Sequence, residues 1–175
     1  MLQVIIITKV ERSVYVRALK TKKVSGANPL WKMYETIHFI KVFKNVIIIE
    51  ISRYMPSVKW KHFIYRKGLN MKIGNETAFA FKATPDIMFP ELISIGKNCV
   101  IGYNATILCH EYLVDEYRIG HVNIGDNVLI GANATILAGV NIGSNATVAS
   151  GTIVTKDVPD GLMAFGNPMQ LKKRR

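Results

Sequence analysis

Branched aliphatic residues recur at every sixth position through the second half of the chain. The repeat occupies six successive steps, at Ile124, Ile130, Ile136, Ile142, Val148 and Val154, and the same phase appears earlier at Ile95, Ile101 and Ile107. The residue directly after each aliphatic residue is mostly a very small one, such as Gly or Ala. The third position after it holds Asn or Gly, which tolerate the left-handed backbone of a tight corner. The fourth position is small enough to point inward.

This period indicates a solenoid in which each hexad supplies one short strand and one corner. Three hexads close a triangular coil, and stacked coils bury the aliphatic side chains along the axis while their backbones pair as parallel sheets. The sequence therefore predicts a mainly β fold. Its architecture is a left-handed parallel β-helix of hexapeptide repeats with an N-terminal α-helical cap.

The cap is predicted from two helical patterns. Asn28 and Pro29 resemble a helix start, and Pro56 ends this helix because proline disfavours the helical conformation in the residue before it. A second helix is predicted from its cap Ser57 to Gly68. One face of the first helix is expected to be apolar, because aliphatic residues recur at steps of three, four or seven, at Met33, Ile37, Ile40, Ile47 and Ile51.

Half of the chain's 16 aromatic residues lie between positions 31 and 65, interleaved with Lys and Arg. One interpretation is an amphipathic basic surface for an anionic membrane or an anionic polymer. The other is a helical cap whose aromatic side chains pack on the next domain and whose lysines are solvated. Both interpretations stay open at this point, and residues 1–23 alternate too weakly to be assigned.

Charge divides the chain into regions. The net charge is +11, but residues 1–72 carry 15 Lys and Arg against three Glu, whereas residues 73–171 carry four against nine acidic residues. We therefore expect three parts: a basic, aromatic-rich segment over 1–70 with about two helices, the β-helix over 71–169, and a basic tail over 170–175. Because the predicted solenoid is mildly acidic, the overall charge does not predict nucleic acid as a partner.

Composition also indicates the compartment. A chain with 49% hydrophobic and 20% charged residues is not intrinsically disordered. Two cysteines, Cys99 and Cys109, cannot form a disulfide framework, which favours a reducing compartment. The apolar start has neither preceding basic residues nor a small-residue cleavage site. No apolar run approaches the roughly 20 residues of a spanning helix. A cytoplasmic location is expected, with peripheral membrane contact as the open alternative.

The repeat breaks between Ile107 and Ile124, which lie 17 residues apart rather than the 18 of a full coil. Loops inserted at solenoid corners commonly carry function, and this one concentrates titratable groups around His110. Imidazole is the usual base near neutral pH, although a lone histidine is more often structural. The neighbouring acidic residues either orient the imidazole or are solvated loop charges.

Two competing chemistries are less well supported by the pattern. Of the four histidines, only His110 and His121 lie in the repeat, and their spacing does not suit a three-histidine zinc site, so no metal is expected. Cys109 beside His110 suggests a Cys–His nucleophile pair, but adjacent residues of a strand point to opposite faces. A packed core thiol is the preferred interpretation for Cys109 and for Cys99.

The segments Ile124-Gly-Asp-Asn-Val-Leu-Ile-Gly131, Ile136-Leu-Ala-Gly-Val-Asn-Ile-Gly143, Gly151-Thr-Ile-Val-Thr-Lys-Asp-Val-Pro159 and Gly166-Asn-Pro168 resemble the hexapeptide-repeat O-acetyltransferases. That family includes the maltose, galactoside and nodulation acetyltransferases, and the specific match covers about residues 70–173. From about Val24 onward, the chain also resembles an uncharacterised bacterial branch of acetyltransferases.

The resemblance implies a homotrimer that binds acetyl-CoA in clefts between neighbouring β-helices, with no metal. By motif position, Ala132 and Ser150 match residues whose backbone contacts the pantetheine arm. Thr155 and Lys156 match a pair near the nucleotide end of the cofactor. Lys173 occupies the position of a family arginine, where a cation suits the phosphates of CoA.

The resemblance also places His110 as the general base that deprotonates an acceptor hydroxyl. Asp86, Glu111 and Glu116 are further candidates for binding the acceptor. The predicted function is therefore an acetyl-CoA-dependent O-acetyltransferase acting on a sugar, glycan or related small acceptor. The alternatives are an N-acyltransferase acting on an amino sugar and a non-catalytic trimeric scaffold that binds anionic surfaces.

Overall fold

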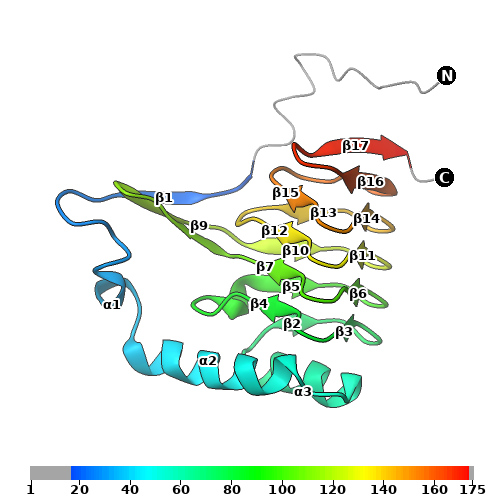
Figure 1. The fold of residues 1–175 in the computed structure, drawn as a ribbon, viewed down its shortest axis with the longest axis horizontal. Coiled ribbons are helices and arrows are strands. Elements are labelled where there is room, and N and C mark those ends of the chain that lie inside the picture. The colour runs from blue at the N-terminus through cyan, green and yellow to red at the C-terminus, as the bar shows by residue number, and fades with distance from the viewer. Residues whose placement is uncertain (1–16, 174–175) are drawn as a thin grey trace.

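The computed structural model describes residues 17–173, and these residues form a parallel β-helix with helices across one end (Figure 1). The first sheet contains β2 (Lys72–Ile73), β5 (Ile93–Ile95), β10 (Val122–Ile124) and β13 (Asn141–Ile142). The second contains β3 (Ala78–Phe79), β6 (Val100–Ile101), β11 (Leu129–Ile130), β14 (Thr147–Val148), β16 (Leu162–Phe165) and β17 (Gln170–Lys173). The third contains β4 (Thr84–Pro85), β7 (Thr106–Ile107), β12 (Thr135–Ile136) and β15 (Ile153–Val154). Apart from the antiparallel β16–β17 pair, neighbouring strands in these sheets are parallel, which confirms the predicted architecture.

The register of the coils corrects the expected break in the repeat. Ile124 pairs with Ile142 at the predicted 18-residue spacing. Ile95, however, pairs with Ile124, which is 29 residues further along. The segment after Ile107 is therefore an 11-residue insertion at one corner and not a coil shortened by one residue. A second insertion lies one coil earlier, where Pro85 pairs with Ile107 at a spacing of 22 residues and a 3₁₀ helix spans Pro90–Leu92.

The corners adopt the backbone conformation that the Asn and Gly positions predict. Asn127, Asn133 and Asn145 have φ values between +56° and +58°, and Gly139 and Gly151 are also left-handed. Equivalent asparagines hydrogen-bond between neighbouring coils, since Asn104 Nδ2 donates to Asn133 Oδ1 at 2.9 Å. The corners thus stack in columns, and the side chain at one corner stabilises the next.

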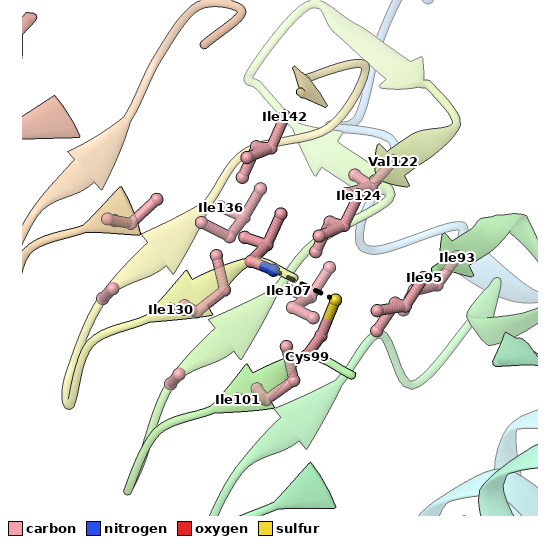
Figure 2. Packing of buried hydrophobic residues seen from close by; sticks show 14 of the residues in the cluster. Ile93, Ile95, Cys99, Ile101, Ile107, Val122, Ile124, Ile130, Ile136 and Ile142 are labelled. Carbon is pink, nitrogen blue, oxygen red and sulfur yellow. Dashed lines mark hydrogen bonds between the residues drawn. The ribbon is translucent and has the colours of Figure 1, made fainter. Parts of the chain in front are cut away.

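The aliphatic residues of the repeat form a continuous core along the axis (Figure 2). Ile107, Ile130 and Ile136 are almost completely buried, and their side chains meet in the interior. Cys99 lies among them with its thiol against the backbone, accepting from Val128 N at 3.4 Å and donating to Gly125 O at 3.1 Å. This confirms the packed-thiol interpretation for Cys99.

Three helices form the cap: α1 (Met33–Thr36), α2 (Phe39–Arg53) and α3 (Val58–Gly68). The prediction of one helix from Pro29 is wrong because Ile37 is extended and separates α1 from α2. Asn28 caps only a turn, in which its Oδ1 accepts from Trp31 N at 3.0 Å. The second helix is confirmed, since the Ser57 side chain accepts from Trp60 N and the helix ends at Gly68.

The apolar residues that the sequence places on one face of the first helix point away from the solenoid where they belong to α2. Ile40, Ile47 and Ile51 are exposed, and the buried residues are Val42, Asn45, Ile49 and Ser52. Aliphatic residues surround this part of the helix, so periodicity alone does not select one face. The choice is made by the solenoid, because Asn45 Nδ2 donates to Ile87 O at 3.0 Å and places the polar residue inside.

An arm of three antiparallel strands leaves the side of the solenoid (Figure 1). It consists of β1 (Lys20–Lys23), β9 (Glu116–Ile119) and β8 (His110–Tyr112), with β9 in the middle. Val114, at the turn between β8 and β9, is 82% exposed. Within the described part of the chain, no helix is long and apolar enough to cross a membrane. The apolar start of the chain and the last two residues of the basic tail lie outside the described residues.

Candidate active site

The two inserted corners bring Asp86 and His110 together. Asp86 directly follows β4, and His110 begins β8 just after β7, so both leave the third sheet at the same corner of neighbouring coils. Asp86 Oδ2 lies 2.6 Å from His110 Nδ1. Stacking of the coils therefore creates a carboxylate–imidazole pair from residues 24 positions apart.

Four donors surround the Asp86 carboxylate. Oδ1 accepts from the backbone N–H of Met88 and of Phe89, both at 2.8 Å. Oδ2 accepts from Cys109 N at 2.6 Å as well as from His110 Nδ1. Burial acts to raise the pKa of Asp86, but the hydrogen bond and charge of His110 and the backbone donors outweigh it and hold the pKa below its usual range. The side chain is thus a fully buried carboxylate at neutral pH.

Two aromatic rings enclose the imidazole of His110. The Phe89 and Tyr112 rings lie edge-on to it, with centroids at 6.1 Å and 5.5 Å. Its side chain remains 16% exposed. Asp86 accepts a hydrogen bond from the Nδ1–H group, which fixes the tautomer whose Nε2 carries the free lone pair. Within residues 17–173, no hydrogen-bond partner engages Nε2, so this atom is available to remove a proton from a bound group.

Asp86 thus occupies a different place from the acceptor pocket suggested by the sequence. Its side chain has no exposed surface, and all its contacts hold the base and the adjacent backbone. This role can be predicted from the sequence only if the first coil is recognised. The first coil contains Phe79 and Pro85 where later hexads have a branched aliphatic residue followed by a small one, so the repeat is not visible there. Phe89 and Tyr112 carry no sequence signal because they belong to the two insertions.

The acidic residues of the β8–β9 hairpin form ion pairs. Glu111 binds the Arg17 guanidinium and lies 3.8 Å from Arg118. Glu116 pairs with the same Arg118 at 2.5 Å. Both were candidates for acceptor binding, and in this chain they link β8, β9 and the segment before β1. These ion pairs therefore hold the arm that carries His110.

A cavity of about 670 Å³ adjoins this arm. Its walls include Phe89 and Leu92 from the first insertion, Tyr117 and Ile119 from β9, and His121. Phe89 borders the cavity and also contacts the imidazole of His110, so one side chain separates the cavity from the base. A largely apolar hollow beside a positioned polar group is typical of a small-molecule site.

The positions matched to the cofactor lie along both edges of the third sheet. Ala132 and Ser150 are on corners that precede this sheet, one coil apart, and Gly151 N donates to Ala132 O at 2.8 Å. Thr155 and Lys156 follow β15 at the corner column that also carries His110. Within one chain these two groups therefore lie on opposite edges of the sheet.

Lys173 is exposed in β17, opposite Leu162. Cys109, adjacent to His110, is completely buried. Burial raises the pKa of its thiol, and the charge of Asp86 raises it further, so the thiolate nucleophile is disfavoured. Over the described residues, no group of three or more His, Cys, Asp or Glu is arranged to hold a metal ion.

The fold places this chain among the hexapeptide-repeat proteins, and its inserted corner carries a histidine that is oriented by a carboxylate. Residues 92–107 and 121–156 match the family model for the hexapeptide repeat of succinyl-transferase. The chain is 60% identical over 148 residues to "Putative acetyltransferase YvoF" of Bacillus subtilis, covering 85% of this chain and 86% of that protein. It is 56% identical over 159 residues to "Putative acetyltransferase SAR0816" of Staphylococcus aureus, covering 91% and 99%. The chain therefore belongs to the hexapeptide-repeat acetyltransferase family.

Solved structures share the fold. A hexapeptide-repeat acetyltransferase of Vibrio cholerae, VCA0836, complexed with acetyl coenzyme A, superposes with a TM-score of 0.64 at 19% identity, covering 77% of this chain and 86% of that one. A galactoside acetyltransferase in complex with coenzyme A gives a TM-score of 0.58 at 22% identity, covering 77% and 80%. At this level of identity the likeness concerns the fold, and it confirms the left-handed hexapeptide β-helix.

Proposed function

We propose that this protein transfers the acetyl group of acetyl-CoA to a hydroxyl of a sugar, glycan or related small acceptor, with His110 as general base. The observation that carries the proposal is the Asp86–His110 pair, which leaves Nε2 without a hydrogen-bond partner among residues 17–173. Family membership supports the same chemistry, and the relatives above carry the name acetyltransferase.

In this reaction His110 Nε2 takes the proton of the acceptor hydroxyl as its oxygen attacks the carbonyl carbon of the thioester. A carbon–oxygen bond forms, the carbon–sulfur bond breaks, and the imidazolium returns the proton to the departing sulfur. The buried charge of Asp86 stabilises the transient imidazolium across the 2.6 Å contact. Asp86 is therefore a positioning residue, and His110 is the catalytic residue.

The cofactor-binding residues suit a site shared between copies. Ala132 and Ser150 lie on corners formed by small residues, where backbone groups can contact a ligand. At the adjacent Gly151, no heavy atom lies within 4 Å of the position that a Cβ would take. Lys156 and Lys173 supply cations for phosphate groups. Because Ala132 and Thr155 lie on opposite edges of one sheet, we propose that a cleft between two subunits combines one edge from each. A closed homotrimer satisfies this requirement, and the exposed tip of the arm at Val114 is suited to contact a neighbour.

We further propose that the parts defined by composition are functional units. In this division, residues 1–70 are the basic N-terminal segment that contains the helices of the cap, residues 71–169 perform the transfer, and the tail over 170–175 contributes Lys173 to the cofactor. Free cysteines and use of acetyl-CoA are consistent with a cytoplasmic enzyme.

The test is release of free CoA thiol from acetyl-CoA in the presence of a panel of sugars and amino sugars. His110→Ala is expected to lose turnover by about 10²- to 10⁴-fold while retaining CoA binding. His38→Ala is the matched control, because His38 is exposed and its side chain does not cap α2. Turnover with amino sugars alone would support N-acetylation instead. Absence of both CoA binding and His110-dependent turnover would leave a non-catalytic scaffold.

The assembly is tested separately by sedimentation velocity. A species with three times the mass of the chain is expected, and CoA binding is expected to disappear if the trimer is dissociated. A monomer that binds CoA with unchanged affinity would contradict the shared cleft.

A further inference from the structure

The outward faces of α2 and α3 form a surface that we call the helical base. These helices lie across the end of the solenoid next to β2 and β3, away from β16 and β17 (Figure 1). The apolar members of the base are Ile40, Phe43, Ile47, Ile51, Tyr54, Trp60 and Phe63. All of them are exposed, so seven neighbouring large apolar side chains share one end of the molecule.

The base reverses the usual pattern of a surface helix. The side of α2 that faces the solenoid includes Asn45, whereas Ile40 is 78% exposed and Phe43 is 57% exposed on the opposite side. A helix on a soluble domain normally turns its polar face outward. On α3, Trp60 is 63% exposed while the buried face contains Lys61. A concentration of exposed large apolar side chains on two adjacent helices indicates an interaction site.

The earlier alternative, in which the aromatic residues of this segment pack on the solenoid, is wrong for most of them. Seven of the eight aromatic residues between positions 31 and 65 are exposed, and only Tyr65 is buried. Tyr65 anchors α3 through a hydrogen bond from its hydroxyl to Ala83 O at 3.2 Å and through its ring contact with Phe79. One aromatic residue thus suffices to attach the helix, whereas the exposed rings of Phe39 and Phe43, and of Trp60 and Phe63, contact each other.

Basic side chains interleave with the apolar ones. Lys59, Arg66 and Lys67 are exposed on α3 and have no ion-pair partner among residues 17–173. Positions 31–68 contain eight Lys and Arg residues but only two Glu residues, so this segment is strongly basic. Of the two glutamates, Glu50 is paired with Arg53. The base therefore combines exposed apolar side chains with unpaired positive charge.

This charge decides between possible occupants. Two copies packed base to base would bring the unpaired cations of both α3 helices together, which is unfavourable. An anionic bilayer surface accepts the cations at its headgroups and the Trp, Tyr and Phe rings at the boundary with the acyl chains. With 15 residues, α2 is too short to span a bilayer but suits a position in its plane.

We propose that the helical base docks this protein onto anionic lipid membranes, with α2 and α3 lying in the plane of the headgroups. The apolar face enters the boundary region, and Lys59, Arg66 and Lys67 contact lipid phosphates. The inference does not require the proposed transferase activity. It places the protein as a peripheral membrane protein held by two signals, apolar burial and charge.

The test is sedimentation of the full-length protein with vesicles of phosphatidylcholine containing phosphatidylglycerol, compared with phosphatidylcholine alone, at low and high salt. Wild-type protein is expected to bind only the anionic vesicles and to lose most binding at high salt. Because each lysine near an anionic surface contributes about fivefold, Lys59→Gln with Lys67→Gln is expected to weaken binding about 25-fold. Lys97→Gln, at an exposed solenoid corner, is the matched charge control and is expected to bind as wild type.

A second pair of variants tests the apolar contribution. Phe43→Ser with Trp60→Ser removes two exposed rings, so the fold is retained while vesicle binding falls at every salt concentration. Val100→Ser, at an exposed apolar position on β6, is the control and is expected to leave binding unchanged. The proposal is overturned if wild-type protein stays in the supernatant, if it binds neutral vesicles equally, or if the base variants bind normally. A wild-type mass twice that of Phe43→Ser/Trp60→Ser would assign the base to a second copy. None of these measurements uses acetyl-CoA, so their outcome is independent of the transferase test.

Discussion

Replacing Asp86 by asparagine tests the geometry of the active site with a change of one atom. All four groups around the carboxylate are donors: the backbone N–H of Met88, Phe89 and Cys109, and His110 Nδ1. An amide has one accepting oxygen and one NH₂ group. In either orientation the NH₂ of Asp86→Asn must therefore face two of these donors, which a carboxylate never does.

Two consequences follow, with different magnitudes. With the NH₂ facing Met88 and Phe89, two buried donors lack an acceptor. With the NH₂ facing Cys109 and His110, only the Cys109 N–H lacks one, because the imidazole can change its tautomer. The second orientation is therefore expected, and it lowers the free energy of unfolding by about 1 to 3 kcal/mol. When the NH₂ faces His110, Nδ1 becomes the acceptor and Nε2 carries the proton, so the base is in the wrong tautomer. Loss of general-base catalysis is expected to reduce kcat/KM by about 10²- to 10⁴-fold, which corresponds to about 3 to 5 kcal/mol of barrier.

The decisive measurement is the nitrogen chemical shifts of the His110 ring, because a merely structural role for Asp86 would not move them. We expect the protonated nitrogen to change from Nδ1 to Nε2 in Asp86→Asn, with CoA affinity unchanged. Asp157→Asn is the matched control, since Asp157 also accepts from a backbone N–H, that of Asn141 at 2.7 Å, but it follows β15, three coils further along the solenoid than Asp86. An Asp86→Asn protein with the wild-type tautomer and activity within threefold of wild type would refute the reasoning.

The pH dependence of stability gives an independent readout of the same pair. The folded-state pKa of Asp86 lies below its unfolded value, so its stabilising contribution is present above the unfolded pKa of about 4 and is lost as the pH falls through the folded pKa. Wild-type protein is therefore expected to lose more stability in acid than Asp86→Asn does. Parallel stability curves for the two proteins below pH 4 would contradict this.

Three further predictions concern the framework and are checked by chemical denaturation. Ile136→Ala, in the fully buried core, is expected to destabilise by about 3 kcal/mol, and Leu129→Ala, on the exposed side of its strand, by much less; equal losses would contradict the axial core. Asn133→Ala is expected to be about 1 kcal/mol less stable than Asn133→Gly, because the corner has φ +57° and both variants lose the same side-chain bond; equal stabilities would show that the conformation costs nothing there. Burial lowers the pKa of Lys61, so wild type is expected to gain stability relative to Lys61→Met as the pH rises from the folded pKa towards 10.5; a constant difference would contradict the shift.

The regular part of the solenoid was predictable because each hexad repeats one physical requirement. A branched side chain fills the axis, a tiny residue allows close stacking, and Asn or Gly turns the corner, as at Ile130, Gly131 and Asn133. Gly131 shows the requirement for close stacking directly, since an added Cβ would lie 2.5 Å from Ser150 N. Agreement among several columns of the repeat made this prediction specific.

The first coil and the cap were less predictable for physical reasons. Phe79 and Pro85 take the places of branched aliphatic residues in the first coil, so the hexad pattern does not predict this coil. In α2, aliphatic residues occur on all sides, and the buried face depends on the acceptor that Ile87 offers to Asn45. That acceptor comes from an insertion whose position only the fold reveals.

The site itself depends on an argument about register. In a solenoid, residues at the same corner of successive coils are neighbours whatever lies between them in sequence, so two insertions at one corner must meet. The insertion after Pro85 supplies Asp86 and Phe89, and the insertion after Ile107 supplies His110 and the arm. Regular corners all carry small residues and the same backbone hydrogen bonds. They therefore supply none of the larger polar side chains that a reactive centre needs. A reactive centre is therefore expected where two successive coils each carry an insertion at the same corner. A histidine at such a corner is a positioned base, and not an isolated histidine, when the preceding coil supplies a carboxylate there.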